Sequence, residues 1–173
     1  MNGDWDLTPD TSRKERIGFD ETIFCASKTP DQINRLLQAA LRTEEPLLLT
    51  RLDSEKFSEL SCELSERLDY DEVSQTAVLG HLPVPEDTPC VAIVSAGSSD
   101  VRVAREAART LQYYRVGVHE IYDVGVAGLW RLLDRVEQLR DMSVVITMAG
   151  MEGTLPSVVA GLVPGLVIAV PVA

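Results

Sequence analysis

Four short apolar runs alternate with stretches of helical periodicity in the second half of the chain, and this alternation restricts the fold more than any other feature. The runs are largely apolar rather than apolar at every second position, which is typical of strands buried on both faces of a parallel sheet. Apolar residues recur at helical spacing over 100–114 and over 126–140, where Leu129, Leu133 and Val136 form the stripe. The runs lie at 91–94, 116–121, 143–148 and 166–170. We therefore expect an α/β fold with a doubly wound parallel sheet.

The first half of the chain is acidic and is predicted to form a separate unit. Residues 1–88 contain 9 Lys+Arg and 19 Asp+Glu, whereas residues 89–173 contain 7 and 8. Three prolines between 83 and 89 favour an extended connector over a helix or an inner strand. We predict a polar tail at 1–15, a small N-terminal α/β domain at 16–82, a linker at 83–89 and the sheet domain at 90–173.

Two helices and three strands are expected in the small domain. Thr29 is the predicted N-cap of a helix that begins at Pro30, because these residue types suit the cap and the first helical position. Asp53 is the predicted cap of a second helix that extends through Leu68. Strands are predicted at 22–25, 47–50 and 73–79.

Charge and composition argue against several classes of function. A net charge of -11 disfavours binding to the phosphate backbone of nucleic acid and to anionic lipid. The longest uncharged apolar stretch, 157–173, contains two glycines and two prolines and is shorter than a membrane span of about 20 residues. The first ten residues lack the apolar core of a secretory signal. We expect a cytoplasmic protein with no nucleic-acid or membrane partner.

The cysteines and histidines give no clear chemical motif. Cys25, Cys62 and Cys90 are odd in number, far apart and outside any CxxC pair, so we expect no disulfide framework and no metal site. Each is interpreted as a structural thiol, because no base is near it in sequence. His119 lies inside an apolar run, where a core or interface histidine is commoner than a catalyst.

Glycine-containing segments follow the first three apolar runs and are the strongest candidates for a ligand site. Ligands of open α/β sheets bind outside the carboxyl ends of the strands, where glycine allows close approach of the backbone and the hydroxyls of Ser98 and Ser99 can donate hydrogen bonds. Any one segment alone is more simply a tight turn with Ser99 or Asp100 as a helix cap, but three at one sheet edge favour a site. The usual dinucleotide and triphosphate motifs, GxGxxG and GxxxxGK[ST], do not occur. The candidate binding residues are Ala96, Gly97, Ser98, Ser99, Asp100, Gly125, Val126, Ala127, Gly128, Ala149, Gly150, Met151 and Gly153.

Glu152 is the candidate for acid/base chemistry. It is the only charged residue after Asp141 and lies between glycines beside apolar strands. Burial there would suit it to proton transfer. An acidic residue in the first turn of a helix is an equally good interpretation of the same pattern.

SAGSSD at 95–100 resembles a segment of the LarB family, PurE-related enzymes of nickel-pincer cofactor biosynthesis. SAGSSD at 95–100 also resembles the phosphate loop of the PurE aminoimidazole ribonucleotide carboxylases and mutases. The other LarB-like segments are YDVGVAGLWRLL at 122–133, AGMEGTLPSVVAGL at 149–162, RIGFDETIF at 16–24, KTPDQI at 28–33 and LLLTRL at 47–52.

The resemblance implies carboxylation of the pyridinium ring of nicotinic acid adenine dinucleotide, with hydrolysis of the phosphoanhydride and release of AMP. It implies that the dinucleotide is a substrate, with carbon dioxide or bicarbonate as co-substrate and no tightly bound cofactor. NAD is a second candidate ligand, and Mg²⁺ is a candidate companion of the phosphates. Proton handling at the ring falls to Glu152. The family also implies a homo-oligomer, between a dimer and an octamer.

Departures from the related patterns define two alternatives. A PurE-type imidazole ribonucleotide carboxylase or mutase is disfavoured, because Gly125 and Thr154 stand where that family has its histidines. The nucleophilic cysteine of LarB lies in a stretch beyond the final strand, and none of the three cysteines matches it. We therefore expect the PurE-like sheet to be incomplete, with its C-terminal part missing. A non-catalytic nucleotide-binding or regulatory relative is the second alternative.

Overall fold

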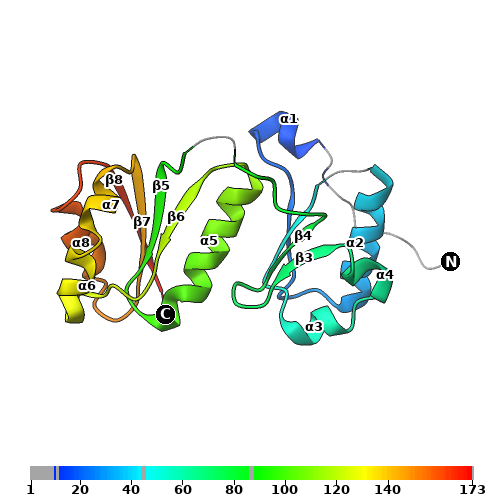
Figure 1. Cartoon of the computed structure of the whole chain (residues 1–173). Helices are drawn as coiled ribbons and strands as arrows, with labels where there is room; N and C mark the ends of the chain where they lie inside the picture. Colours follow the sequence, from blue (N-terminus) through cyan, green and yellow to red (C-terminus); the bar gives the residue numbers. More distant parts are fainter. Residues whose placement is uncertain (1–9, 11, 44–45, 86–87, 173) are drawn as a thin grey trace. The chain divides into compact units, whose positions relative to one another are not determined.

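The computed structural model describes residues 10, 12–43, 46–85 and 88–172. Contacts within the chain divide it into two compact units, Met1–Leu82 and Pro83–Ala173, and each is described by itself (Figure 1). Within the described residues, no helix is both long enough and apolar enough to cross a membrane.

The first unit contains a four-stranded mixed sheet in the order β1-β2-β4-β3. Strands β1 (Thr22–Phe24) and β2 (Leu48–Thr50) are parallel, and they confirm the strands predicted at 22–25 and 47–50. Strand β4 (Thr76–Leu79) is antiparallel both to β2 and to β3 (Leu68–Asp71).

Helix α2 (Pro30–Thr43) covers the apolar side of this sheet and begins at the predicted residue. The hydroxyl of Thr29 accepts a hydrogen bond from the amide of Gln32 (3.3 Å), and the Gln32 side chain accepts one from the amide of Thr29 (3.0 Å). This reciprocal pair is a capping box, which satisfies two amides that have no partner within the helix. Ile33 and Leu37, four residues apart, are fully buried in the core. A further short helix, α1 (Arg13–Ile17), lies near the N-terminus.

The single helix predicted after Asp53 is wrong. Two short helices, α3 (Ser54–Ser58) and α4 (Cys62–Ser65), replace it, and Leu68 begins β3. Both Leu60 and Leu64 are nevertheless buried, because the chain turns between the helices while keeping its apolar residues on the core.

The strand predicted at 73–79 begins only at Thr76, because the residues before it form a hairpin turn. The Asp71 carboxylate accepts hydrogen bonds from the amide and hydroxyl of Ser74 (2.9 and 2.5 Å). Such local side-chain bonds compete with strand extension. Gln75 also has a positive φ of 55°, which ends the turn.

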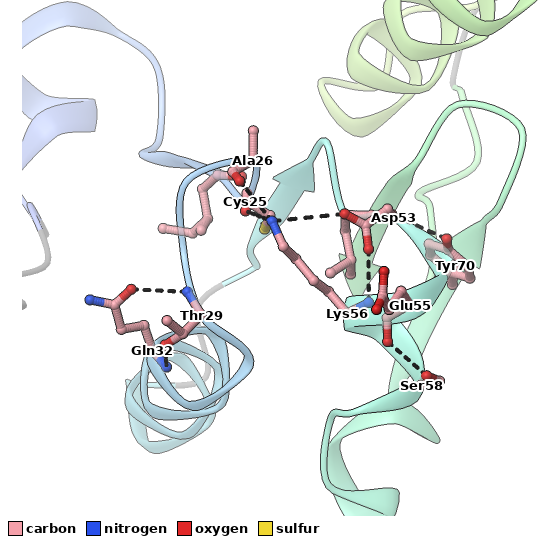
Figure 2. A network of polar contacts seen from close by, with 11 residues as sticks. Cys25, Ala26, Thr29, Gln32, Asp53, Glu55, Lys56, Ser58 and Tyr70 are labelled. Atoms are coloured by element: carbon pink, nitrogen blue, oxygen red, sulfur yellow. Dashed lines mark hydrogen bonds and ion pairs between the residues drawn. The ribbon is translucent and has the colours of Figure 1, made fainter.

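Lys56 joins the end of β1 to α3 (Figure 2). Its Nζ donates to the carbonyl oxygens of Cys25 (2.9 Å) and Ala26 (2.7 Å) and lies 3.8 Å from an Asp53 oxygen. Asp53 also accepts from the Lys56 amide (2.8 Å), which confirms it as a helix cap. These contacts hold the turn that covers the buried Cys25 thiol.

The second unit contains a four-stranded parallel sheet in the order β6-β5-β7-β8. Its strands are β5 (Val91–Ser95), β6 (Val118–Ile121), β7 (Val144–Ala149) and β8 (Leu166–Pro171). Helix α5 (Val101–Tyr113) lies on one face, and α6 (Leu129–Leu133), α7 (Val136–Arg140) and α8 (Leu155–Ala160) lie on the other (Figure 1). The predicted α/β class with a parallel sheet between helices is confirmed.

The helix predicted over 126–140 is broken. A 3₁₀ turn (Val126–Gly128) precedes α6, and the helical run breaks again at residues 134–135 before α7. The predicted apolar stripe is also wrong, because Leu129 and Leu133 are 40% and 46% exposed while Leu132 and Leu139 are fully buried. Leu132 and Leu139, one on each side of the break, pack in the same core.

Candidate functional site

The loops after β5, β6 and β7 meet at the carboxyl edge of the parallel sheet. Ser95, the last residue of β5, is fully buried and holds the β6 loop. Its carbonyl oxygen accepts from the amide of Val124 (3.1 Å), and its hydroxyl accepts from the amide of Asp123 (3.3 Å). The chain leaves β5 toward β6 and later returns to β7 on the other side of β5. Such a reversal is where open α/β sheets bind ligands.

Two glycines allow the loops to approach each other closely. A Cβ atom at Gly125 would lie 2.7 Å from the carbonyl oxygen of Ala96, so only glycine fits against the β5 loop. A Cβ atom at Gly150 would lie 3.1 Å from the carbonyl oxygen of Val172 and 3.8 Å from an Asp100 oxygen. The three segments predicted to converge are therefore brought together.

The β5 loop is fixed by Asp100, whose side chain is 5% exposed. One carboxylate oxygen accepts from the amide of Gly97 (2.9 Å), and the other accepts from the hydroxyl of Ser99 (3.5 Å). Asp100 thus shapes the turn, as the alternative interpretation of this segment expects. Ser98 and Ser99 lie exposed in this 3₁₀ turn, with their hydroxyls at the edge.

Not every candidate residue faces a ligand surface. Ala96, Val126 and Ala149 pack into the apolar core on the α6–α8 side of the sheet. They therefore support the loops through packing and do not face a ligand. Ala127 is exposed, and Gly128 donates its amide to the carbonyl oxygen of Gly125 (3.0 Å).

The β7 loop projects from the edge. Met151 is 96% exposed with a φ of 42°, and Gly153, with a φ of 60°, closes a turn onto Gly150 through a 2.8 Å amide hydrogen bond. Glu152 is also exposed, so the burial expected from its apolar neighbours is absent. It also lies before α8, which begins at Leu155, so it is not in the first helical turn either. The glycines on either side allow the loop to stand away from the strands.

An ion pair in the β6 loop was not predicted from the sequence. Nη1 of Arg131 on α6 lies 2.5 Å from Oδ2 of Asp123, which is the second residue after β6 and has a φ of 58°. No simple pattern marks such a pair, because eight residues and a 3₁₀ turn separate the two side chains.

Comparison with known proteins assigns both units. Residues 7–81 match the LarB/PurE-like N-terminal domain, and residues 90–173 match AIR carboxylase. An uncharacterised protein of Methanocaldococcus jannaschii is 32% identical across 95% of this chain and 67% of its own length. The chain belongs to the LarB/PurE-like family. The carboxyl edge described above is therefore the edge of an AIR carboxylase-type domain.

None of the three cysteines of this LarB/PurE-like chain belongs to the loops that form the carboxyl edge. Burial raises the pKa of Cys25 to about 12, and Cys25 is in the first unit. A hydrogen bond to Glu66 (3.3 Å) raises the pKa of the exposed Cys62 thiol. Cys90 is exposed and precedes β5, at the amino end of that strand.

His119 lies outside the three loops of this edge. The His119 ring lies on β6 and is hydrogen-bonded to the side chain of Gln138 (3.1 Å). Among the described residues, no three His, Cys, Asp or Glu side chains are grouped so that they could hold a metal ion.

Proposed function

We propose that this protein binds nicotinic acid adenine dinucleotide at the carboxyl edge of the second unit for carboxylation of the pyridinium ring. In that reaction a ring carbon forms a bond to carbon dioxide and loses its proton, and water cleaves the phosphoanhydride to release AMP. The observation that carries the proposal is the convergence of three glycine-containing loops at one edge of an AIR carboxylase-type domain.

The loop chemistry suits an anionic ligand. The exposed hydroxyl of Ser98 can donate to a phosphate oxygen, and that of Ser99 can do so after leaving its 3.5 Å contact with Asp100. Gly97 has no side chain to keep a ligand away from the backbone of the β5 loop. Glu152 is exposed on the loop after β7. Its carboxylate is therefore open to a ligand at this edge and can accept the proton that the ring loses.

A PurE-type reaction on imidazole ribonucleotide fits less well. Gly125 occupies the place of a PurE histidine, and even a Cβ atom there would lie 2.7 Å from the Ala96 carbonyl oxygen. The second PurE histidine is replaced by Thr154. The imidazoles that would move protons in that reaction are therefore absent from both positions.

A nucleotide-binding protein without turnover is the second candidate. The observation that favours it is that the three loops of the carboxyl edge contain no cysteine, and that Cys90 of the same unit lies at the amino end of β5. We expect the 173-residue chain to bind the dinucleotide without carboxylating it. Appearance of carboxylated product and AMP with this chain alone would contradict the cysteine-dependent chemistry.

Calorimetric titration tests binding directly. We expect the folded protein to bind nicotinic acid adenine dinucleotide or NAD, and titrations with and without Mg²⁺ test whether the ion accompanies the phosphates. Ser98→Ala should weaken binding by about 1 kcal/mol for one lost hydrogen bond, and by more if phosphate is its partner. Ser143→Ala, at the amino end of β7, is the control and should bind as the wild type does. No affinity of the wild type for either dinucleotide would exclude the proposal.

A further inference from the structure

An open cavity of about 660 Å³ lies in the first unit, lined by the C-terminal part of α2 and by the β3–β4 pair. Aliphatic side chains form much of its wall, with Leu41 from α2, Leu68 from β3 and Leu79 from β4. All three pack against the buried core of the unit and remain only partly buried themselves. A cavity of this size with an apolar wall is typical of sites that bind small molecules.

The lining also contains an arginine and a histidine. Arg67 directly precedes β3, and His81 is the second residue after β4. Both are exposed, and neither the Arg67 guanidinium nor the His81 ring forms a hydrogen bond or an ion pair with any residue that the structure describes. Glu66, the acidic residue in the lining, accepts a hydrogen bond from the Cys62 thiol (3.3 Å). The guanidinium is therefore available to an anion from outside.

Backbone contacts hold these side chains at one end of the cavity. The Gly80 amide donates to the carbonyl oxygen of Arg67 (2.8 Å), and the next pair in register is Leu68 with Leu79. Arg67 and His81 therefore lie at the same end of the β3–β4 pair. Gly80 has a φ of 91°, which glycine adopts without strain, and a Cβ atom there would meet nothing within 4 Å. The backbone at this end is open to a ligand.

Charge limits what the cavity can hold. Residues 1–88 contain 9 Lys+Arg and 19 Asp+Glu, so the unit would repel an extended polyanion such as nucleic acid. A single anionic group avoids most of that repulsion, because charges more than about 10 Å away are screened in moderate salt. It also matches the paired N–H groups of a guanidinium. A cation would meet Arg67, and a neutral molecule would leave it without a partner.

We infer that this cavity binds a small organic anion with an apolar ring system, such as an aromatic carboxylate. The ring system lies against Leu41, Leu68 and Leu79, where it buries apolar surface with few rotatable bonds to immobilise. The anionic group pairs with the Arg67 guanidinium, and the His81 ring can donate a further hydrogen bond. The inference concerns the first unit alone and does not depend on the function proposed for the second.

Heteronuclear NMR titration of the full chain tests this with three probes that share a ring system: naphthoate, neutral naphthamide and the cation naphthylmethylammonium. We expect naphthoate to shift the amide signals of Leu79, Gly80 and His81 saturably, naphthamide to bind more weakly and the cation to bind least. Arg67→Gln should weaken naphthoate binding about fivefold and leave naphthamide binding unchanged, because only the anion pairs with the guanidinium. Arg13→Gln, at an exposed arginine of α1, removes the same charge from the same unit and should bind all three probes as the wild type does.

Leu41→Ala tests the apolar wall. It removes contact with the ring system and should weaken naphthoate and naphthamide binding by the same factor. Val73→Ala, at an exposed valine outside the cavity, is its control, and thermal unfolding shows whether each variant is folded. Naphthoate binding unchanged in Arg67→Gln, or equal binding of naphthoate and naphthamide to the wild type, would overturn the inference. Naphthoate shifts confined to the carboxyl edge of the second unit would also overturn it, and they would leave the proposed function standing.

Discussion

Asp123 and Met151 adopt left-handed backbone conformations, with φ values of 58° and 42°, although neither is glycine. Each lies in a loop at the carboxyl edge of the parallel sheet, after β6 and β7 respectively. Conformations of this kind persist where the surrounding structure imposes them, and they gather at functional sites. The backbone conformations of these two residues therefore point to the carboxyl edge as the functional site, as the glycines of its loops do.

Glu152 is expected to act in chemistry more than in binding. In the form of the protein that turns over the dinucleotide, Glu152→Gln should lower kcat much more than it raises KM, because the amide keeps the shape but cannot accept a proton. Steady-state kinetics of AMP release provide the measurement. Glu137→Gln, on the exposed surface of α7, is the control. A raised KM with an unchanged kcat would indicate a role in binding instead.

Cys25 makes stability depend on pH under alkaline conditions. Burial raises its pKa from 9.0 to about 12, so the fold favours the neutral thiol. This contribution is complete below pH 9, where the unfolded chain is also protonated, and it is lost as the pH rises from 9 toward 12. Between pH 8 and pH 10.5 we expect a loss on the order of 2 kcal/mol in the free energy of unfolding.

Urea denaturation at the two pH values measures this loss. Burial also raises the pKa of Tyr70, so other groups add to the alkaline destabilisation. Cys25→Ala keeps those groups and should therefore show a smaller loss than the wild type. Identical losses in the two proteins would show that Cys25 does not contribute.

At the scale of elements, the Thr29 cap is expected to determine how firmly α2 begins. Thr29→Ala removes the bond to the Gln32 amide and should lower the free energy of unfolding by about 1 kcal/mol. Gln38→Ala, at an exposed position inside the same helix, is the control and should have little effect. Urea denaturation monitored by circular dichroism gives both values, and equal stabilities of the two variants would contradict the cap's contribution.

The parts of the fold that follow local rules could be predicted from sequence. The apolar runs gave four strands near their predicted limits, and the Thr-Pro pair located the start of α2. Breaks within helices could not be predicted, because residues 59–61 and 134–135 contain neither glycine nor proline. The buried leucines in and around each break keep helical spacing, so the apolar pattern gives no sign of the break.

The candidate site also has parts that could be predicted from sequence and parts that could not. Glycines after strands showed where the loops would meet, since glycine at a strand end is a local signal. Glu152 is exposed, and Asp123 pairs with Arg131, because of the direction in which each loop leaves the sheet. That direction cannot be predicted from the spacing of residues in the sequence.

At the scale of the whole molecule, the second unit exposes apolar side chains that a lone chain leaves in water. Leu166 and Ile168 of β8 are 62% and 42% exposed, and in register they neighbour Val144 and Ile146 of β7. Ile146 packs on the α5 side of the sheet, so the two β8 side chains extend that apolar face. Trp130 is a further exposed apolar side chain, at 66%. Exposed apolar patches of this kind mark association sites or aggregation.

We propose that the chain forms a homo-oligomer through this face or aggregates. Light scattering of the purified protein should show a mass above that of one chain. The double substitution Leu166→Glu and Ile168→Glu should shift the protein toward the monomer, whereas Val73→Glu, at an exposed valine of the first unit, should not. A stable wild-type monomer at high concentration that binds no apolar dye would contradict the proposal.

In evolutionary terms, the close approach of Gly125 to the Ala96 carbonyl oxygen couples position 125 to the β5 loop. Any side chain at position 125 requires a shift of that loop, which is itself held by the Asp100 carboxylate. A new side chain at this position therefore needs an accompanying change in the β5 loop, and a single substitution of Gly125 would disturb the packing of the two loops.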